Sequence, residues 1–346
     1  MIESNKIQIE NIYYMLCYSW DRLEYLDRNY VGQLQEKNIL NLLTLVFQKE
    51  VNLIIKKGLY REYVVEKEEC SVIKGKIGFN ESLSLIGKRS GKLVCEYDDM
   101  SYNVQLNRII KTTIINILKV KEIAKDDKKV LKASLMYFSD INKITLTENV
   151  FKKIKYNKIN KKYNFVINIC ELINNNLLLS KDGKEAEFYN FIEDDKKMSL
   201  LFESFVRNFY KRELHKVKVY RENINWKLDG LNKEYLPIMQ TDISLEWKDE
   251  DRKIIIDTKY YREAVKGYRG SEKLRTANLY QLFSYLKNIE VKSEKDRHAD
   301  GILLYPRVDK ELNLKYSMED HNISIYTVNL NCKWQDIHSR LLEIVN

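Results

Sequence analysis

The stretch QTDISLEWKDEDRKIIIDTKYY, residues 240–261, decides how the rest of the chain is interpreted. From Thr241 to Trp247 apolar and polar residues alternate, which is typical of a half-buried strand. The polar run 248–252 predicts a turn. Residues 253–260 then include three consecutive isoleucines, β-branched residues that suit a buried strand. The sequence therefore predicts a β-hairpin.

Acidic and basic residues stand at one end of this hairpin. Asp257 and Lys259 are two residues apart on a strand, so their side chains emerge on the same face. If the strands pair in the simplest register, Asp242 on the first strand lies close to Asp257 on the second. Two carboxylates at one point repel each other unless a cation lies between them, and oxygen ligands with room for water favour Mg²⁺. Bound Mg²⁺ with a nearby lysine suits phosphodiester hydrolysis.

A simpler interpretation of the same residues is a solvated rim of charged side chains. An Asp-x-Lys sequence at a strand end is common in a chain of which 32% is charged. The catalytic interpretation is favoured because a second aspartate stands on the partner strand and an apolar run precedes Asp257.

The arrangement of Asp242 with Asp257-Thr258-Lys259 resembles the PD-(D/E)xK nuclease core, and the wider sequence resembles the McrC family. That family provides the nuclease subunit of McrBC modification-dependent restriction systems. The segments that resemble it are IENIYYMLCYSW (9–20), KGKIGFNESL (74–83), CEYDDMSYNVQLNRIIK (95–111), LFESFVRNFY (201–210), TDISLEW (241–247), IIIDTKYY (254–261) and NLYQLFSYL (278–286). Thr241 stands where the motif has proline, which is not a metal ligand.

The resemblance implies a Mg²⁺-dependent DNA endonuclease subunit. Asp242 and Asp257 would bind the metal, with the carbonyl of Thr258 as a possible further ligand, and Lys259 would assist the attacking water. It further implies a GTP-hydrolysing AAA+ ring as partner, which recognises modified cytosine in double-stranded DNA. GTP would act only through that partner.

Neighbouring helices provide supporting candidates. Residues 198–214 have the spacing of an amphipathic helix, and Glu203 within it is a candidate third carboxylate or an exposed helix glutamate. A second helix is expected at residues 271–287, where Gln281 and Tyr285 are four residues apart and share a face. Many nucleases of this fold have such a pair near the metal or the nucleic acid. Lys273 and Arg275 are candidate phosphate contacts on the same helix.

Composition agrees with a polyanionic partner. The 346 residues include 59 Lys and Arg against 50 Asp and Glu, a net charge of +9. The same excess would fit a merely soluble basic protein. The five cysteines are scattered without a C-x-x-C pair and the four histidines form no H-x-x-x-H pair, so neither a disulfide framework nor a zinc site is expected. With no export or membrane-spanning pattern, we expect a cytoplasmic protein.

The order of predicted elements gives an α/β chain, α+β overall, with two domains. Residues 1–180 are expected to form a partner-binding domain with helices at 9–25 and 37–57, a small β unit at 59–97 and a helical connector. Residues 181–346 are expected to form the PD-(D/E)xK domain, a mixed sheet flanked by helices and closed by a helix at 334–345.

Two other functions stay open on the sequence alone. The basic segment GKRSGK (87–92) lacks the G-x-x-x-x-G-K-[ST] pattern, so any nucleotide motor must be a partner. The chain could instead be a non-catalytic activator of that motor, with a vestigial acidic cluster. It could also be a stand-alone Mg²⁺-dependent exonuclease, as the pair Gln281 and Tyr285 suggests. The modified base, the site spacing and the stoichiometry are not encoded in any recognisable motif.

Overall fold

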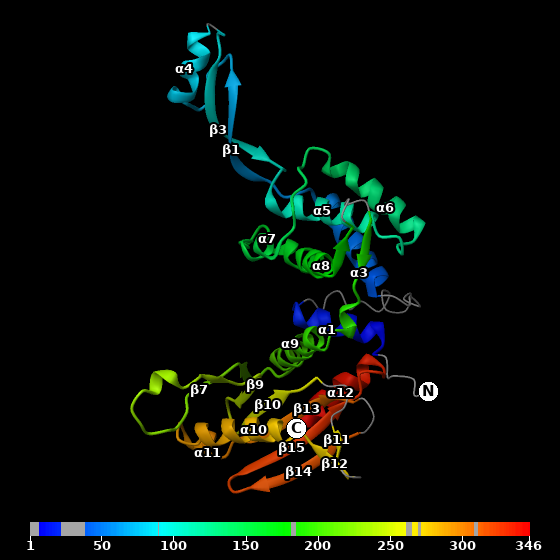
Figure 1. Cartoon of the computed structure of the whole chain (residues 1–346), viewed down its shortest axis with the longest axis vertical. Helices are drawn as coiled ribbons and strands as arrows, with labels where there is room; N and C mark the ends of the chain where they lie inside the picture. Colours follow the sequence, from blue (N-terminus) through cyan, green and yellow to red (C-terminus); the bar gives the residue numbers. More distant parts are fainter. Residues whose placement is uncertain are drawn as a thin grey trace. The chain divides into compact units, whose positions relative to one another are not determined.

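The structure is a computed structural model that describes residues 7–21, 39–88, 90–180, 185–260, 265–268, 271–307 and 311–346. The chain divides into two compact units (Figure 1). Unit 1 combines the described part of the first 37 residues with Phe191–Asn346, and unit 2 comprises Asn38–Asn190. Among the described residues, no helix has both the length and the apolar character needed to cross a membrane.

Unit 1 is built on a six-stranded mixed sheet in the order β14-β15-β13-β10-β9-β6. Its central strands β10, β13 and β15 are parallel, whereas β6, β9 and β14 pair antiparallel with their neighbours. The strands are β6 (Val217–Tyr220), β9 (Ile243–Trp247), β10 (Lys253–Thr258), β13 (Asp300–Pro306), β14 (Asn313–Met318) and β15 (His321–Val328). The predicted mixed sheet is thus confirmed, and its parallel strands all end at one edge.

The hairpin read from the sequence is present as β9 and β10. Every residue of β10 is buried, as the isoleucine run predicts. The register pairs Ile256 with Ile243 and Lys253 with Glu246. Asp242, the residue before β9, therefore lies opposite Asp257, the second-last residue of β10.

Helices cover both faces of this sheet (Figure 1). Helix α9 (Asp195–Glu213) packs on β6 and β10, and α10 (Thr276–Ile289) packs on β10 and β13. The short α11 (Glu294–Arg297) follows α10, and α12 (Trp334–Val345) packs on β15. Helix α1 (Ile9–Ser19) packs against α9 and α12. The strand pair β7 (Asn223–Ile224) and β8 (Met239–Gln240) leads into β9.

The contact between α10 and the sheet is unusually close at Gly301 on β13. A Cβ atom added there would lie 3.0 Å from side-chain carbons of Leu282 and Leu286. These leucines belong to a core that includes Ile255 on β10 and Leu303 on β13. Glycine at this position lets α10 approach the strands, which fixes the helix that bears Gln281 and Tyr285.

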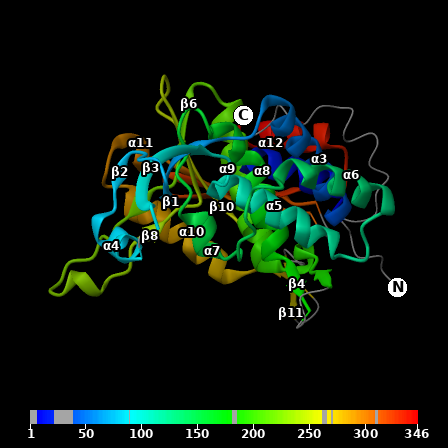
Figure 2. The same ribbon diagram turned by 90° about the horizontal axis from the view of Figure 1, so that it is seen from above.

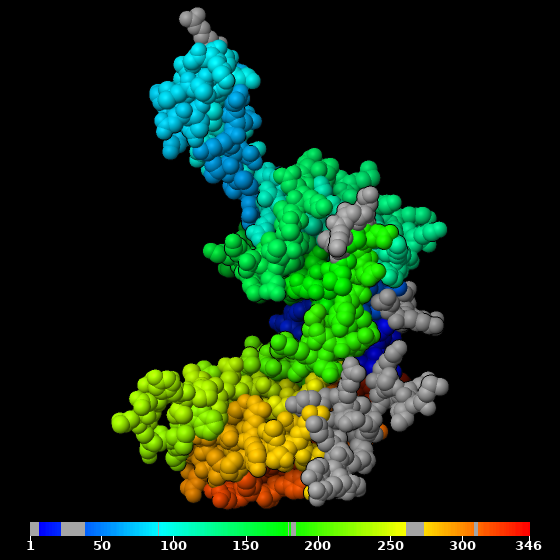
Figure 3. Space-filling view, viewed as in Figure 1, coloured from blue at the N-terminus to red at the C-terminus, as the bar shows by residue number. Residues whose placement is uncertain are grey.

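Unit 2 contains a small sheet and a group of helices (Figures 1 and 2). Strand β1 (Glu62–Cys70) pairs antiparallel with β3 (Leu93–Ser101), which also pairs with β2 (Lys76–Ile77), and α4 (Phe79–Gly87) packs on β3. Within unit 2 this sheet and α4 extend away from the helices (Figure 3). The helices are α3 (Ile39–Lys57), α5 (Gln105–Leu118), α6 (Lys125–Leu135), α7 (Glu148–Lys152) and α8 (Asn164–Asn175), and a strand pair β4 (Leu177–Leu179) and β5 (Ala186–Phe188) completes the unit.

The helix expected at residues 271–287 begins later in the structure, so the predicted start of this helix was wrong. Residues Ser271–Leu274 form strand β12, which pairs antiparallel with β11 (Val265–Tyr268). Helix α10 begins only at Thr276, with Arg275 as its N-cap. Pairing with β11 overrides the local helix propensity of these residues.

The observed division of the chain also differs from the expected domains 1–180 and 181–346. The first described helix belongs to the unit that contains the mixed sheet, because Tyr14 and Tyr18 pack edge-on against Phe205 of α9 at ring-centroid distances of 5.5 and 5.7 Å. Of the helix expected at residues 9–25, the part beyond residue 21 lies outside the described residues.

Candidate active site

Asp257 and Asp242 are neighbours at the edge of the sheet where β10 ends. Asp257 is fully buried near the end of β10. Asp242 immediately precedes β9, and its Oδ2 accepts hydrogen bonds from the backbone nitrogen of Thr258 (2.8 Å) and from its Oγ1 (2.9 Å). The residue after Asp257 therefore fixes the orientation of the Asp242 carboxylate. The two acidic groups predicted from the hairpin meet at one place.

Lys259 joins this pair and is held by the helix across from it. Its Nζ lies 2.7 Å from Asp257 Oδ2 and donates a hydrogen bond of 3.0 Å to Gln281 Oε1 on α10. Gln281 Nε2 donates to the hydroxyl of Tyr285 (2.7 Å), and that hydroxyl donates to the carbonyl of Gln240 (2.9 Å). The pair Gln281 and Tyr285 thus connects the lysine to the backbone that leads into Asp242.

The electrostatics of the site are dominated by burial. The pKa of Asp257 is raised from 3.8 to about 7, chiefly by burial and also by the neighbouring charge of Asp242, while Lys259 acts in the opposite direction. Burial likewise raises the pKa of Tyr285 to about 12, so this hydroxyl stays protonated at neutral pH and donates. An acidic group whose charged form is costly in the protein alone is suited to bind a cation.

The donor set fits a hard divalent cation. Asp257 Oδ1 is buried and has no hydrogen-bond partner, so one carboxylate oxygen is left available beside a second carboxylate. Carboxylate and carbonyl oxygens are the ligands that Mg²⁺ prefers, and Mg²⁺ usually keeps several waters. Among the described residues there is no cluster of three His, Cys, Asp or Glu side chains that could hold a metal. Asp242 and Asp257 would supply two carboxylates to such an ion, which leaves its other positions to a backbone carbonyl and water.

Glu203 lies on α9 but is engaged by two arginines. Its Oε1 is 2.7 Å from Arg207 Nη1 and 3.3 Å from Arg221 Nη2. Arg207 Nη1 also donates to the carbonyl of Asp242 at 3.4 Å. Sequence reasoning missed both arginines. The spacing of Glu203 and Arg207, four residues apart on a helix, was available as a signal, whereas nothing in the sequence places Arg221 beside them.

The candidate phosphate contacts Lys273 and Arg275 are placed differently from the expectation. Lys273 is exposed on strand β12, and Arg275 precedes the first turn of α10. They do not project from the helix that bears Gln281.

A buried ion cluster supports the start of β10, and sequence reasoning did not find it. Lys253, only 3% exposed, pairs with Glu222 at 2.8 Å and with Asp296 of α11. Burial alone would lower the pKa of Lys253, but the hydrogen bonds to Asp296 and Glu222 outweigh it and raise the pKa. Glu222 in turn pairs with Lys292 at 2.8 Å. The sequence does not indicate that Lys253 pairs with Glu222 and Asp296, because both residues are distant from it along the chain.

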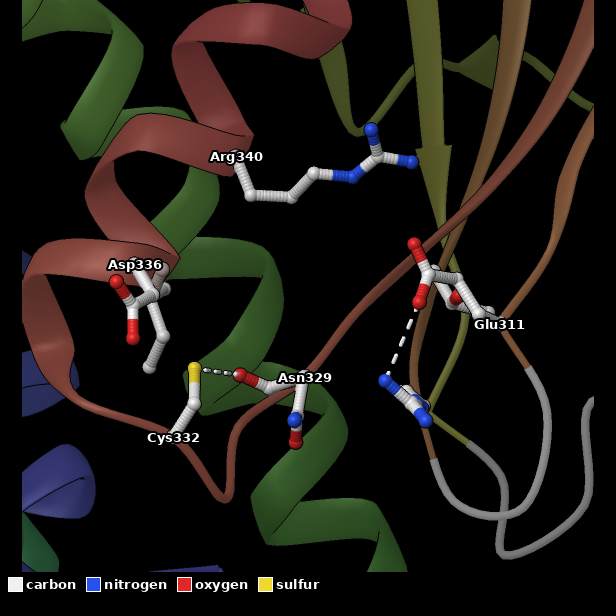
Figure 4. A pocket seen from close by; sticks show the side chains of 8 residues that line it. Glu311, Asn329, Cys332, Asp336 and Arg340 are labelled. Atoms are coloured by element: carbon white, nitrogen blue, oxygen red, sulfur yellow. Dashed lines mark hydrogen bonds and ion pairs between the residues drawn. The ribbon is translucent and has the colours of Figure 1, made fainter.

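A separate cavity of about 200 Å³ lies where β13 and β15 end and α12 begins (Figure 4). Arg307 pairs with Glu311 at 3.2 Å, and Cys332 Sγ donates to the carbonyl of Asn329 at 3.0 Å. Arg340 also lines the cavity, while Asp257 and Asp242 do not. Its positive and negative side chains balance, so it does not compete with the aspartate pair as a metal site.

Comparisons with known proteins show the family of this chain. The chain matches the family model described as McrBC 5-methylcytosine restriction system component over residues 2–306. It is 31% identical over 346 residues to the Escherichia coli (strain K12) protein described as Type IV methyl-directed restriction enzyme EcoKMcrBC, with 99% of this chain and 98% of that protein covered.

Two solved structures are also similar to this chain. One describes a half-complex from a tetradecameric assembly of Thermococcus gammatolerans McrB AAA+ hexamers with bound McrC. It matches with a TM-score of 0.58 and 17% identity, covering 98% of this chain and 76% of that chain. A second, of the Thermococcus gammatolerans McrBC complex, has a TM-score of 0.44 and 18% identity, covering 62% of this chain and 61% of that chain. The first likeness supports the same overall fold.

Proposed function

This chain belongs to the McrBC 5-methylcytosine restriction system family, and we propose that it is the Mg²⁺-dependent DNA endonuclease subunit of such a system. The observation that supports the proposal most directly is the Asp257 carboxylate. It is fully buried, lies next to Asp242, is contacted by Lys259 and keeps one oxygen without a hydrogen bond. A buried aspartate with a purely structural role would have hydrogen-bond partners for both of its oxygens.

The residues of the site have distinct roles in this proposal. Asp242 and Asp257 would hold Mg²⁺ with the carbonyl of Thr258, and the bound ion would supply charge stabilisation and a more acidic water. Thr258 orients Asp242 through its two hydrogen bonds. Lys259 faces the same point and is positioned to direct the attacking water and to offset negative charge on the phosphate.

Gln281 and Tyr285 keep the Lys259 ammonium in place. Without the bond to Gln281, the long lysine side chain would be free to leave the carboxylates for solvent. Glu203 is the candidate third carboxylate. Its Oε1 contacts Arg207 and Arg221, so in this proposal Glu203 supports the site through these arginines.

The partner in this proposal is a GTP-hydrolysing AAA+ ring. One solved structure of similar fold is described as an assembly of McrB AAA+ hexamers with bound McrC. We expect this chain to dock on such a ring through unit 2, and GTP to act only there. The ring would recognise modified cytosine in double-stranded DNA.

The test is cleavage of plasmid DNA by the purified chain together with the AAA+ protein of the same system. Plasmids with and without 5-methylcytosine are compared, with Mg²⁺ and GTP each present or omitted. We expect double-strand cleavage only when the modification, Mg²⁺, GTP and both proteins are present. In Asp257→Asn we expect cleavage to fall at least a thousandfold while stimulation of GTP hydrolysis stays within twofold of the unmodified chain.

Two outcomes would point to another function. Undiminished cleavage with Asp257→Asn would show that this chain is an activator and that the cut is made elsewhere. Mg²⁺-dependent degradation of unmodified DNA ends by the chain alone, without GTP, would show a stand-alone exonuclease.

A further inference from the structure

Arg221 lies near the segment that leads into Asp242. It follows β6, whose last residue Tyr220 pairs with Ser244 of β9. The antiparallel register therefore continues past Tyr220 towards Asp242, and the backbone nitrogen of Thr241 donates to the carbonyl of Glu222 at 2.9 Å. Arg221 is therefore one residue beyond β6 and opposite Ile243, the residue after Asp242, near the edge of the sheet where β10 ends.

Glu203 connects Arg221 to the rest of the site. A single oxygen, Oε1, contacts Arg221 Nη2 at 3.3 Å and Arg207 Nη1 at 2.7 Å. Arg207 also donates to the carbonyl of Asp242, so it is held on two sides. The side chains of Glu203 and Arg207 are 16% and 21% exposed, whereas that of Arg221 is 44% exposed. Arg207 closes the inner side of the cluster and Arg221 faces solvent.

The Arg221 guanidinium has N–H donors that its contact with Glu203 does not use. Arginine has five N–H donors in a planar fork, and the contact with Glu203 involves one nitrogen, Nη2. The carboxylate behind it restricts the side chain, which lowers the entropy lost when a ligand binds. The fork geometry matches a phosphate, to which arginine donates in pairs.

The charge of the site explains why such a group is needed there. Asp242, Asp257 and Glu203 bring three carboxylates close to the path that a DNA strand must take to reach Lys259. Without Arg221 these three carboxylates are accompanied by two cations, Lys259 and Arg207, so a further cation at the rim reduces the repulsion of an approaching phosphate. Arg221 is the exposed cation joined to this cluster by a described contact.

We propose that Arg221 binds a phosphate of the DNA strand adjacent to the bond that is cut, and that Glu203 is a positioning residue that holds Arg221 rather than a metal ligand. This inference rests on the proposed nuclease function. The ligand class is a nucleic-acid phosphodiester, recognised through its charge and not through its base sequence.

The experiment compares Arg221→Ala with Arg212→Ala in the assembled complex. Arg212 is also on unit 1, is 49% exposed and makes an exposed ion pair with Asp21. It lies nine residues from Glu203 on α9, about 13 Å along the helix axis. Both variants lose one positive charge, so the general electrostatic effect is matched. Binding of a duplex containing 5-methylcytosine is measured with Mg²⁺ present in a Lys259→Gln background, so that the duplex stays intact.

We expect Arg221→Ala to weaken binding by about 10-fold to 100-fold and to reduce the slope of log affinity against log salt by about one. Arg212→Ala should change affinity less than twofold. With Lys259 restored, Arg221→Ala should lower cleavage mainly through a higher DNA concentration at half-maximal rate, and the Mg²⁺ concentration at half-maximal rate should not change.

Glu203 variants separate the two roles of that residue. Glu203→Gln should weaken DNA binding and leave the Mg²⁺ requirement unchanged, and Glu203→Asp should restore part of the binding. An increased Mg²⁺ requirement in Glu203→Gln would overturn the positioning role, and Arg221→Ala within twofold of the unmodified complex would overturn the phosphate contact. Failure of the nuclease function itself would appear separately, as absence of cleavage by the unmodified complex.

Discussion

Asp242 and Thr258 are joined by two hydrogen bonds to one carboxylate oxygen, one from the backbone nitrogen and one from the hydroxyl. The backbone donor belongs to the strand end and is present with any residue at position 258, whereas the hydroxyl donor depends on the side chain. The arrangement makes Thr258 an orienting residue for the acidic group on the neighbouring strand.

Thr258→Val should therefore lower the cleavage rate without abolishing it. Valine keeps the shape and the backbone donor but removes the hydroxyl, and a hydrogen bond to a charged group contributes about 1.5–3 kcal/mol. We expect a fall in kcat of about tenfold. Thr258→Ser, which keeps the hydroxyl, should stay within about threefold. Equal activity in all three proteins would show that the backbone bond alone holds Asp242.

Asp257→Asn should stabilise the protein at neutral pH in the absence of metal. The pKa of Asp257 is raised from 3.8 to about 7, so ionisation of this buried group destabilises the folded state. The folded protein therefore gains from protonation at low pH, and this gain is lost as pH rises from about 4 through about 7. Asparagine does not ionise and avoids the loss, whose ceiling is roughly 4 kcal/mol.

The measurement is thermal unfolding in EDTA at pH 5 and pH 8. The midpoint of the variant should exceed that of the unmodified chain by more at pH 8 than at pH 5. Addition of Mg²⁺ at pH 8 should raise the midpoint of the unmodified chain and leave the variant nearly unchanged. A difference that does not depend on pH would contradict the assignment of Asp257 as the titrating group.

Gly301→Ala should impair both stability and cleavage. The new methyl group would meet Leu282 and Leu286 at 3.0 Å and force α10 away from the sheet. Overpacking of this kind costs about 1–3 kcal/mol. Because α10 bears Gln281, the displacement should also loosen Lys259 and lower kcat. Leu282→Ala combined with Gly301→Ala should recover part of the cleavage rate, which a merely unfolded variant would not allow.

Lys253→Met should be among the most destabilising substitutions near the site. It would leave Glu222 and Asp296 in a buried cluster without their shared cation, a change that typically costs about 3–5 kcal/mol. Lys292→Ala removes a 38% exposed partner of Glu222 and should cost less than about 1 kcal/mol. Urea unfolding of both variants measures the difference, and similar values for the two would contradict the importance of burial.

The elements predicted best from the sequence are those whose signal is local. The hairpin of β9 and β10 follows from alternation, a polar turn and an isoleucine run, and its short turn leaves little freedom in the register, so the meeting of Asp242 and Asp257 could be anticipated. The helix expected at residues 334–345 has the same bounds in the structure. In each case the period of apolar residues identifies the buried face.

What could not be predicted depends on partners distant in the sequence. Residues 271–274 resemble the start of a helix until their pairing with β11 is known. The contact between Glu203 and Arg221 could not be predicted, because Arg221 comes from a distant segment of the chain. Tyr14 and Tyr18 clearly belong to a core, but the sequence does not say that Phe205 of α9 covers them.

The packing of α1 on α9 makes unit 2 an insertion within unit 1, because the chain leaves that unit after its first helix and returns at Phe191. A truncated protein that begins at residue 191 would uncover Phe205 and Phe209, and Tyr18 would no longer be present to bond Glu213. Production of unit 1 by itself should therefore replace residues 38–190 with a short flexible linker and retain the amino-terminal helix.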